Sequence, residues 1–220
     1  MKLQSGTLLH DLPMLRHGPK NALAHEYYGW LLVSTDDPAK GITEGRKSLE
    51  VDPLSVEAAV VLAQSNYLLR RYGEATDLSQ KAKDQEPDYP LTYWVLGQVY
   101  LAQGHTEDAV AALEKGRQVG PLDWTSEVLA AAYAAVARRA EAEKILKDLD
   151  ERSKSGGHVP AYHLSFAYLA LNDRDRALAA LEKDYEQRSP NMTYIKLDPG
   201  LDRLHNELRY RALLRKMKLE

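Results

Sequence analysis

The sequence predicts an all-α protein built from repeated pairs of antiparallel helices. Four prolines, Pro19, Pro53, Pro87 and Pro121, lie 34 residues apart, and a fixed period of about 20–50 residues is the signature of a repeat architecture. Two series of small residues keep the same period. The first is Gly29, Ala63 and Gly97, and the second, twelve residues later, is Gly41, Ala75 and Ala109. Small residues at a constant position in each pair are expected where two helix axes cross closely.

The stretch from Tyr93 to Pro121 shows the repeat most clearly. Its sequence, YWVLGQVYLAQGHTEDAVAALEKGRQVGP, predicts two helices joined by a turn at residues 103–105. Gly97 falls inside the first helix, where glycine costs about 0.8–1 kcal/mol relative to alanine. We expect Gly97 to face Ala109 of the second helix, because two small residues at a crossing let the backbones approach.

This pattern resembles the tetratricopeptide repeat. In the copy that begins at Pro90, the residues that match W-x2-L-G-x2-Y are Tyr93, Leu96, Gly97 and Tyr100. Those that match the following A-x3-F…P are Ala109, Leu113 and Pro121. The resemblance implies a right-handed α-α superhelical solenoid of about five repeats with a C-terminal capping helix.

Five copies are expected, at residues 22–55, 56–89, 90–122, 123–157 and 158–191. The first is irregular, because Gly41 and Gly45 fall within its second helix and cost roughly 1 kcal/mol each; this helix is expected to fray first. In the fourth copy, Gly156 and Gly157 replace the closing proline. Residues 1–21 are expected to be an irregular N-terminal cap or the degraded end of a further copy.

The repeat stops after Pro190, and residues 192–220 are expected to form a connector and a C-terminal capping helix. The sequence Asp198-Pro199-Gly200 predicts a turn, and the helix is expected from about Asn206. The apolar stripe of this helix consists of Tyr210, Leu213, Leu214 and Met217. Its arginines and lysines are interpreted as a solvated face, because one short basic run without interleaved aromatic residues is weak evidence for nucleic-acid binding.

Residues 22–218 are also similar to the C-terminal repeat region of bacterial multidomain regulators. In those proteins a winged-helix domain, an adenylate cyclase or a Ser/Thr kinase precedes the repeats. The matching elements are Pro160-Ala161-Tyr162-His163 and residues 177–188, 196–199 and 209–217. No winged helix and no Gly-rich or HRD-type kinase loop is found in this sequence, so the resemblance implies only the interaction module.

Composition narrows the class of protein further. The chain has a formal net charge of −3, and 44% of its residues are hydrophobic; this balance argues against nucleic acid as a partner. The absence of cysteine excludes disulfides and thiolate metal sites and fits a cytoplasmic location. No uninterrupted apolar run predicts a signal peptide or a membrane span.

Motifs of catalysis and metal binding are not found. The seven histidines are scattered, and His158 and His163 flank a helix start without a carboxylate at zinc-site spacing. The sequence has no P-loop, dinucleotide-binding or GxSxG motif. We therefore predict a protein that is not an enzyme and that has no cofactor or metal.

The remaining candidate for a functional site is a partner-binding surface. In tetratricopeptide proteins the first helix of each repeat lines the concave side, and this resemblance implies partner-binding positions at Trp30, Gln64, Tyr67, Trp94, Gln98, Trp124, Tyr162 and Phe166. Trp and Tyr are frequent hot spots of interfaces, although aromatic side chains at helical spacing also commonly pack between helices. The fifth and ninth positions of the first helices lack the cations of a carboxylate clamp, which disfavours chaperone tails as ligands.

Two functions follow from these observations. The first is an interaction scaffold whose aromatic groove binds a peptide or helix of a partner protein, as a regulatory module. The alternative is a structural module that self-associates through an uncapped N-terminal repeat, since an uncapped solenoid end exposes apolar surface.

Overall fold

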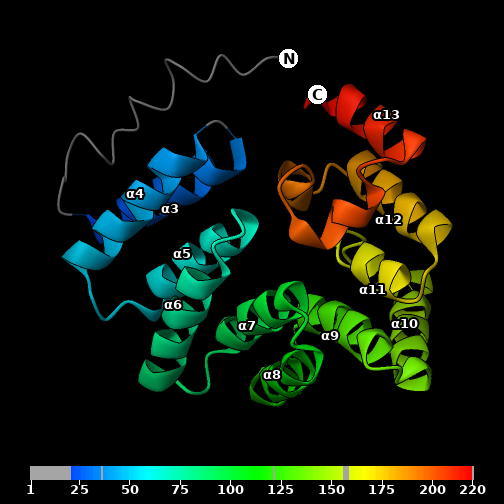
Figure 1. Cartoon of the computed structure of the whole chain (residues 1–220), viewed down its shortest axis with the longest axis horizontal. Coiled ribbons are helices and arrows are strands. Elements are labelled where there is room, and N and C mark those ends of the chain that lie inside the picture. Colours follow the sequence, from blue (N-terminus) through cyan, green and yellow to red (C-terminus); the bar gives the residue numbers. More distant parts are fainter. Residues whose placement is uncertain (1–20, 36, 121, 156–158, 220) are drawn as a thin grey trace. The chain divides into compact units, whose positions relative to one another are not determined.

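The computed structural model describes residues 21–35, 37–120, 122–155 and 159–219, and all regular elements in these ranges are helices (Figure 1). The all-α fold class is confirmed. The chain divides into two compact units, Met1–Glu86 and Pro87–Glu220. The expectations for the N-terminal cap, for Pro19 and Pro121 and for the break at residues 156–158 lie outside the described residues.

The first unit contains α3 (Ala22–Thr35), α4 (Pro38–Val51), α5 (Val56–Leu68) and α6 (Tyr72–Gln85). Consecutive helices pack as pairs, α3 with α4 and α5 with α6. The side chains of Asp37 and Ser55 accept hydrogen bonds from Lys40 N and Ala58 N, so both capping residues satisfy an otherwise unpaired amide at a helix start.

The two glycines of α4 have a packing role. The helix is continuous through Gly41 and Gly45, and both are buried. A Cβ on Gly41 would lie 2.7 Å from the carbonyl oxygen of Gly29, and one on Gly45 would lie 2.7 Å from Cδ1 of Leu62. The glycines that looked like irregularities are therefore the positions at which α4 approaches α3 and α5.

A buried polar contact also joins α3 to α4. Nδ1 of His25 lies 2.7 Å from a carboxylate oxygen of Glu44, and Lys47 donates to the other oxygen at 3.0 Å. Burial alone would raise the pKa of Glu44, but the hydrogen bonds from His25 and Lys47 prevail and lower it. The carboxylate thus remains charged while it is paired.

The second unit contains α7 (Pro90–Gln103), α8 (Thr106–Val119), α9 (Asp123–Ala135), α10 (Arg139–Lys154), α11 (Leu164–Ala170), α12 (Arg174–Glu186), η1 (Pro190–Tyr194), η2 (Pro199–Leu204) and α13 (Leu208–Met217). The predicted turn at residues 103–105 is confirmed between α7 and α8. Gly104 ends α7 in the left-handed conformation, at φ 79°, where glycine is not strained.

The same turn recurs with other residues. Arg70, Ala137 and Asn172 follow α5, α9 and α11 with φ of 59°, 61° and 63°. Together with Gly104 they are spaced at the repeat period. The turn geometry is therefore imposed by the packing of each helix pair, because a non-glycine residue adopts this conformation only at a cost of about 1–2 kcal/mol.

The partner of Gly97 differs from the expectation. A Cβ on Gly97 would lie 2.3 Å from Cγ of Leu113, and its three nearest atoms all belong to this leucine rather than to Ala109. Both Leu113 and Ala109 are fully buried. Gly97 thus makes room for a large side chain of α8, one helical turn beyond the small residue.

The C-terminal capping helix is confirmed and is α13. It packs on α12 through Tyr210 and Leu213, which are 0% and 3% exposed, and the Tyr210 hydroxyl donates to the Ile195 carbonyl. Arg209 pairs with Glu182 of α12 at 2.8 Å. Preceding α13, residues predicted as a connector form η1 and η2, and the predicted turn at residues 198–200 is the start of η2.

Candidate partner-binding surface

Aromatic rings gather on the first helices of the second unit. Here the first-helix face means the surface that carries the predicted residues Trp94, Gln98, Trp124, Tyr162 and Phe166. The rings of Trp94 on α7 and Trp124 on α9 have centroids 5.4 Å apart. The ring of His163, immediately before α11, meets Trp94 edge-on at 5.6 Å and Phe166 at 5.4 Å.

These residues differ in accessibility. Trp124 is partly exposed, whereas Trp94 is 9% exposed, with its indole Nε1 buried and unpaired within the described residues. Phe166, Gln98 and Tyr162 are buried, Tyr162 almost completely. Trp124 is therefore the most accessible of the five residues of the first-helix face, and its ring packs against the ring of Trp94.

An acid lies under the aromatic cluster. Glu127 of α9 is 0% exposed, and its Oε2 lies 3.4 Å from Nδ1 of His163. Burial raises the pKa of Glu127, and His163 offsets this only in part. This buried acid therefore lies at the contact between α9 and the segment before α11.

The C-terminal segment covers part of the first-helix face. In Figure 1, η2 (orange) lies inside the curve of this unit, against α7 and α11. A Cβ on Gly200 would lie 3.0 Å from the Phe166 ring, and the Tyr162 hydroxyl donates to Asp198 at 3.2 Å. Arg203 donates to the carbonyl oxygen of Leu169. We call residues 190–204 the C-terminal strap.

The strap is part of the folded core. Ile195, Leu201 and Leu204 are each 0% exposed, and full burial of such a side chain contributes about 1.5–3 kcal/mol. A ligand would have to replace roughly 5–9 kcal/mol of apolar burial to displace these three residues. Tyr162 and Phe166 therefore pack beneath the strap, and their role in binding a partner stays a prediction.

The predicted residues of the first unit form a separate group. Trp30 on α3 is partly exposed. Gln64 and Tyr67 on α5 are 6% and 2% exposed, and the Tyr67 ring lies 6.3 Å from that of Tyr72. In this unit too, a tryptophan is the most accessible of the predicted positions.

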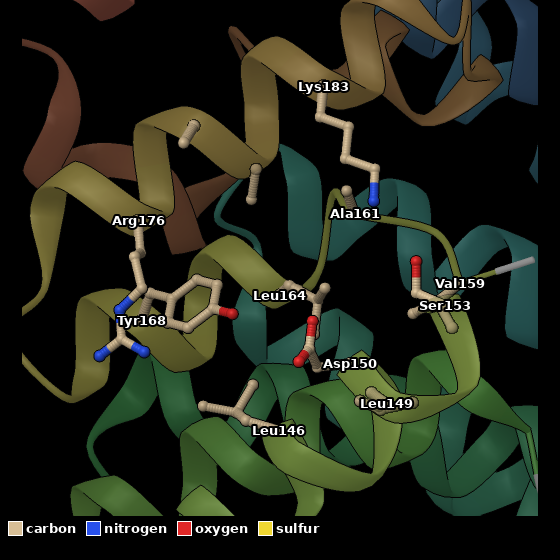
Figure 2. Close-up of a pocket in the computed structure, with 12 residues that line it drawn as sticks. Leu146, Leu149, Asp150, Ser153, Val159, Ala161, Leu164, Tyr168, Arg176 and Lys183 are labelled. Carbon is tan, nitrogen blue, oxygen red and sulfur yellow. The ribbon is translucent and has the colours of Figure 1, made fainter. Parts of the chain in front are cut away.

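A pocket that the sequence did not predict lies in the second unit, and none of the residues of the first-helix face lines it. It has a volume of about 220 Å³ and is bounded by α10, the start of α11 and α12 (Figure 2). Its apolar walls include Leu146, Leu149 and Leu164, and Ala179 and Ala180 line the α12 side. We call it the outer pocket. In the sequence, only the two adjacent alanines Ala179 and Ala180 could have indicated this pocket.

No group of three or more His, Cys, Asp or Glu side chains in the described ranges could hold a metal ion. Nor does any helix among the described residues combine the length and apolar character needed to cross a membrane.

Comparison with known proteins agrees with the fold. The family model described as "Tetratricopeptide repeat" matches residues 91–116, which span α7 and most of α8. A search of curated proteins finds no match.

Solved structures are similar over most of the chain. TTC0263, a thermophilic TPR protein of Thermus thermophilus, is 22% identical with a TM-score of 0.62, covering 82% of this chain and 98% of its own. MamA is 26% identical with a TM-score of 0.55, covering 66% and 85%. YrrB is 16% identical with a TM-score of 0.50, covering 84% and 95%. Together with the paired helices at a constant period, these comparisons show a tetratricopeptide repeat at residues 91–116 and the helical-repeat fold of TPR structures over most of the chain.

Proposed function

We propose that the chain is a non-catalytic scaffold that binds a peptide or helix of a partner protein on its first-helix face. The observation that carries this proposal is the Trp94–Trp124 pair. Trp124 is partly exposed and lies against a nearly buried second tryptophan at 5.4 Å. A rigid, amphipathic ring of this kind supplies contact area at a low entropic cost.

The comparisons support this class of function. Tetratricopeptide repeats generally act as protein-interaction scaffolds, and YrrB is described as a TPR protein with an unusual peptide-binding site. Trp30 gives the first unit an accessible ring of the same type. Because the strap covers Tyr162 and Phe166, the partner is expected to contact the face around Trp124 on the second unit.

The test is quantitative capture of partners from the native host by the full chain and by Trp124→Ala. Trp124→Ala is expected to lose the specific partner, whereas Tyr185→Ala should retain it. Tyr185 is a suitable control because it is a partly exposed aromatic residue on the second helix α12. A folded Trp124→Ala variant that captures the same proteins as wild type would contradict the proposal.

The likeness of residues 22–218 to the repeat region of bacterial regulators supports a finer proposal. We infer that the scaffold serves as the regulatory module of a bacterial signalling or transcription regulator in the cytoplasm. Deletion of its coding region should then change the output of one specific pathway, and an unchanged transcriptome would oppose this assignment.

A second function, self-association, is favoured by one observation on α3. Leu23 and Tyr27 lie one helical turn apart and are 45% and 55% exposed, and an exposed apolar patch of this kind suits a contact between two copies. Sedimentation over a concentration series should show a dimer that Tyr27→Lys dissociates. Leu54→Lys, which replaces another exposed leucine (76%), is the control that should leave it intact.

A further inference from the structure

A groove of the first unit combines apolar and acidic side chains. It has a volume of about 410 Å³ and is lined by residues of α4, α5 and α6. Its apolar part consists of Leu62, which is buried, and of Leu49 and Leu78, which are partly exposed. We call it the leucine groove. A concave surface with apolar walls and a few polar groups is the usual form of a binding site.

The charged side chains of the leucine groove are mainly acidic. Arg46 and Glu74 form an ion pair at 2.6 Å, so their charges largely cancel. The two other charged residues of the lining, Glu50 and Asp77, are exposed. Within the part of the chain that the structure describes, neither of these carboxylates forms an ion pair. The groove therefore favours a ligand that carries positive charge beside an apolar group.

The outer pocket of the second unit differs in charge. Its acid Asp150 lies 2.6 Å from Lys154, and its Arg176 lies 2.6 Å from Asp173. The remaining charged residue of its lining is Lys183, which Figure 2 shows extending from α12 into the space near Ala161. A cationic ligand is therefore expected to prefer the leucine groove to the outer pocket.

The outer face of α13 has the complementary character. Leu208 is 77% exposed, and at 100° per residue it lies on the side of the helix opposite the buried Tyr210 and Leu213. The exposed residues Arg211 and Lys216 lie on either side of Leu208 around the helix. This face thus offers an apolar anchor flanked by cations.

We propose that the leucine groove binds α13 of a second copy of the chain. Leu208 of one copy packs on the leucines of the groove, and Arg211 and Lys216 face the carboxylates of Glu50 and Asp77. An exposed apolar residue and a complementary pocket elsewhere on the same molecule form a heterologous contact. Such a contact adds copies head to tail, as an open chain or a closed ring.

This contact goes beyond the proposed scaffold function and uses other surfaces. It involves neither the first-helix face nor the exposed patch of α3, so each can fail independently of the others. The contact is expected to be weak, because one anchor side chain and a few exposed charges contribute little. Association must therefore be followed up to millimolar concentration.

The first test is sedimentation velocity of the full chain carrying Tyr27→Lys, which removes the contact through α3. At 50 mM NaCl the weight-average mass should rise with concentration above that of a monomer, and 500 mM NaCl should weaken association several-fold through screening. Arg211→Glu should weaken it about tenfold, because an attraction becomes a repulsion. Lys144→Glu, the same change of charge at an exposed position of α10, should leave it unchanged.

Mixing two variants of this parent chain tests the pairing of the surfaces. The groove variant carries Glu50→Lys and Asp77→Lys, and the helix variant carries Leu208→Lys. All three positions are exposed, so both variants are expected to fold, which circular dichroism checks. Each should be monomeric alone. Their equimolar mixture should form a 1:1 dimer, because the intact α13 of the groove variant binds the intact groove of the helix variant.

Three results would overturn the proposal. They are a parent chain that stays monomeric at 50 mM NaCl, a single variant that associates as the parent does, and a mixture that remains monomeric. A fluorescein-labelled model helix of leucine and lysine separates another occupant. If the parent chain stays monomeric but binds this helix, and the groove variant does not, the leucine groove takes a basic helix of a different protein and the assignment to a second copy is refuted.

Discussion

Gly29 and Gly41 pack backbone against backbone. A Cβ on Gly29 would lie 2.8 Å from the carbonyl oxygen of Gly41, and a Cβ on Gly41 would lie 2.7 Å from that of Gly29. Neither oxygen can move without disturbing its helix, so this reciprocal contact sets the separation of α3 and α4. It explains why two residues with poor helix propensity occur in a continuous helix pair.

Gly41→Ala is therefore expected to lower the free energy of unfolding of the first unit by about 1–3 kcal/mol, because overpacking forces the helices apart. The control is Gly73→Ala on α6, where an added Cβ meets no atom within 4 Å; this change should stabilise by several tenths of a kcal/mol. Urea unfolding followed by circular dichroism measures both. Similar midpoints for the two variants would show that the glycine contact does not limit the packing.

Ala137→Gly is expected to stabilise the second unit. Ala137 has a φ of 61°, and relief of a left-handed alanine by glycine is worth about 1–2 kcal/mol, partly offset by the larger entropy of glycine in the unfolded chain. We expect a net gain of about 0.5–1 kcal/mol in thermal or urea unfolding. Ala111→Gly, at an exposed position within α8, should instead destabilise by about 1 kcal/mol; a loss in both variants would argue against strain at Ala137.

Stability of the first unit is expected to depend on Glu26. Burial, assisted by the nearby Glu57 carboxylate, raises the pKa of Glu26 from 4.5 to about 7. The folded chain therefore binds more protons than the unfolded chain between these values, and the contribution of this residue is full below pH 4.5 and is lost as pH rises toward 7.

Glu26→Gln should remove this pH dependence and be more stable than wild type above pH 7, by on the order of 1–3 kcal/mol. Urea midpoints at pH 5, 6, 7 and 8 give the comparison. Glu50→Gln, at an exposed position of α4, controls for the loss of one negative charge. Parallel curves for wild type and Glu26→Gln would mean that Glu26 is ionised in the folded chain.

The strap is expected to contribute strongly to stability. Leu201→Ala removes a side chain that is 0% exposed and should cost about 2–5 kcal/mol through lost burial and a residual cavity. Leu208→Ala, at a position 77% exposed, should change the unfolding free energy by less than about 0.5 kcal/mol. Equal effects in the two variants would show that the strap is not packed on the repeats.

The structure agrees with the sequence reasoning wherever the repeat period decides the outcome. Spaced small residues and the turn at residues 103–105 predicted the helix pair α7 and α8, and the stripe around Tyr210 and Leu213 predicted a helix that covers the last repeat. These features depend on local propensity and on one buried helical face, and both can be read from residues close together in the chain.

The candidate site was less accessible to such reasoning. The family positions indicated Trp94, Trp124 and Phe166 as one surface; in the structure Trp94 meets Trp124 directly, and the ring of His163 lies between Trp94 and Phe166. Phe166 lies beneath Gly200 because residues 190–204 return to a helix about thirty residues earlier in the chain. Trp124 stays partly exposed in this arrangement. No periodic pattern encodes such a contact.

By itself, the sequence determined the helical repeat, its period and the closing helix, because each follows from the spacing of small, apolar and helix-breaking residues. Only the tertiary structure decided that Gly97 accommodates Leu113, that the strap occupies part of the first-helix face, and that Tyr168 and Arg176 border an open pocket. These outcomes depend on the shapes of side chains that meet across separate helices. Packing of that kind is a property of the assembled fold, not of any one segment.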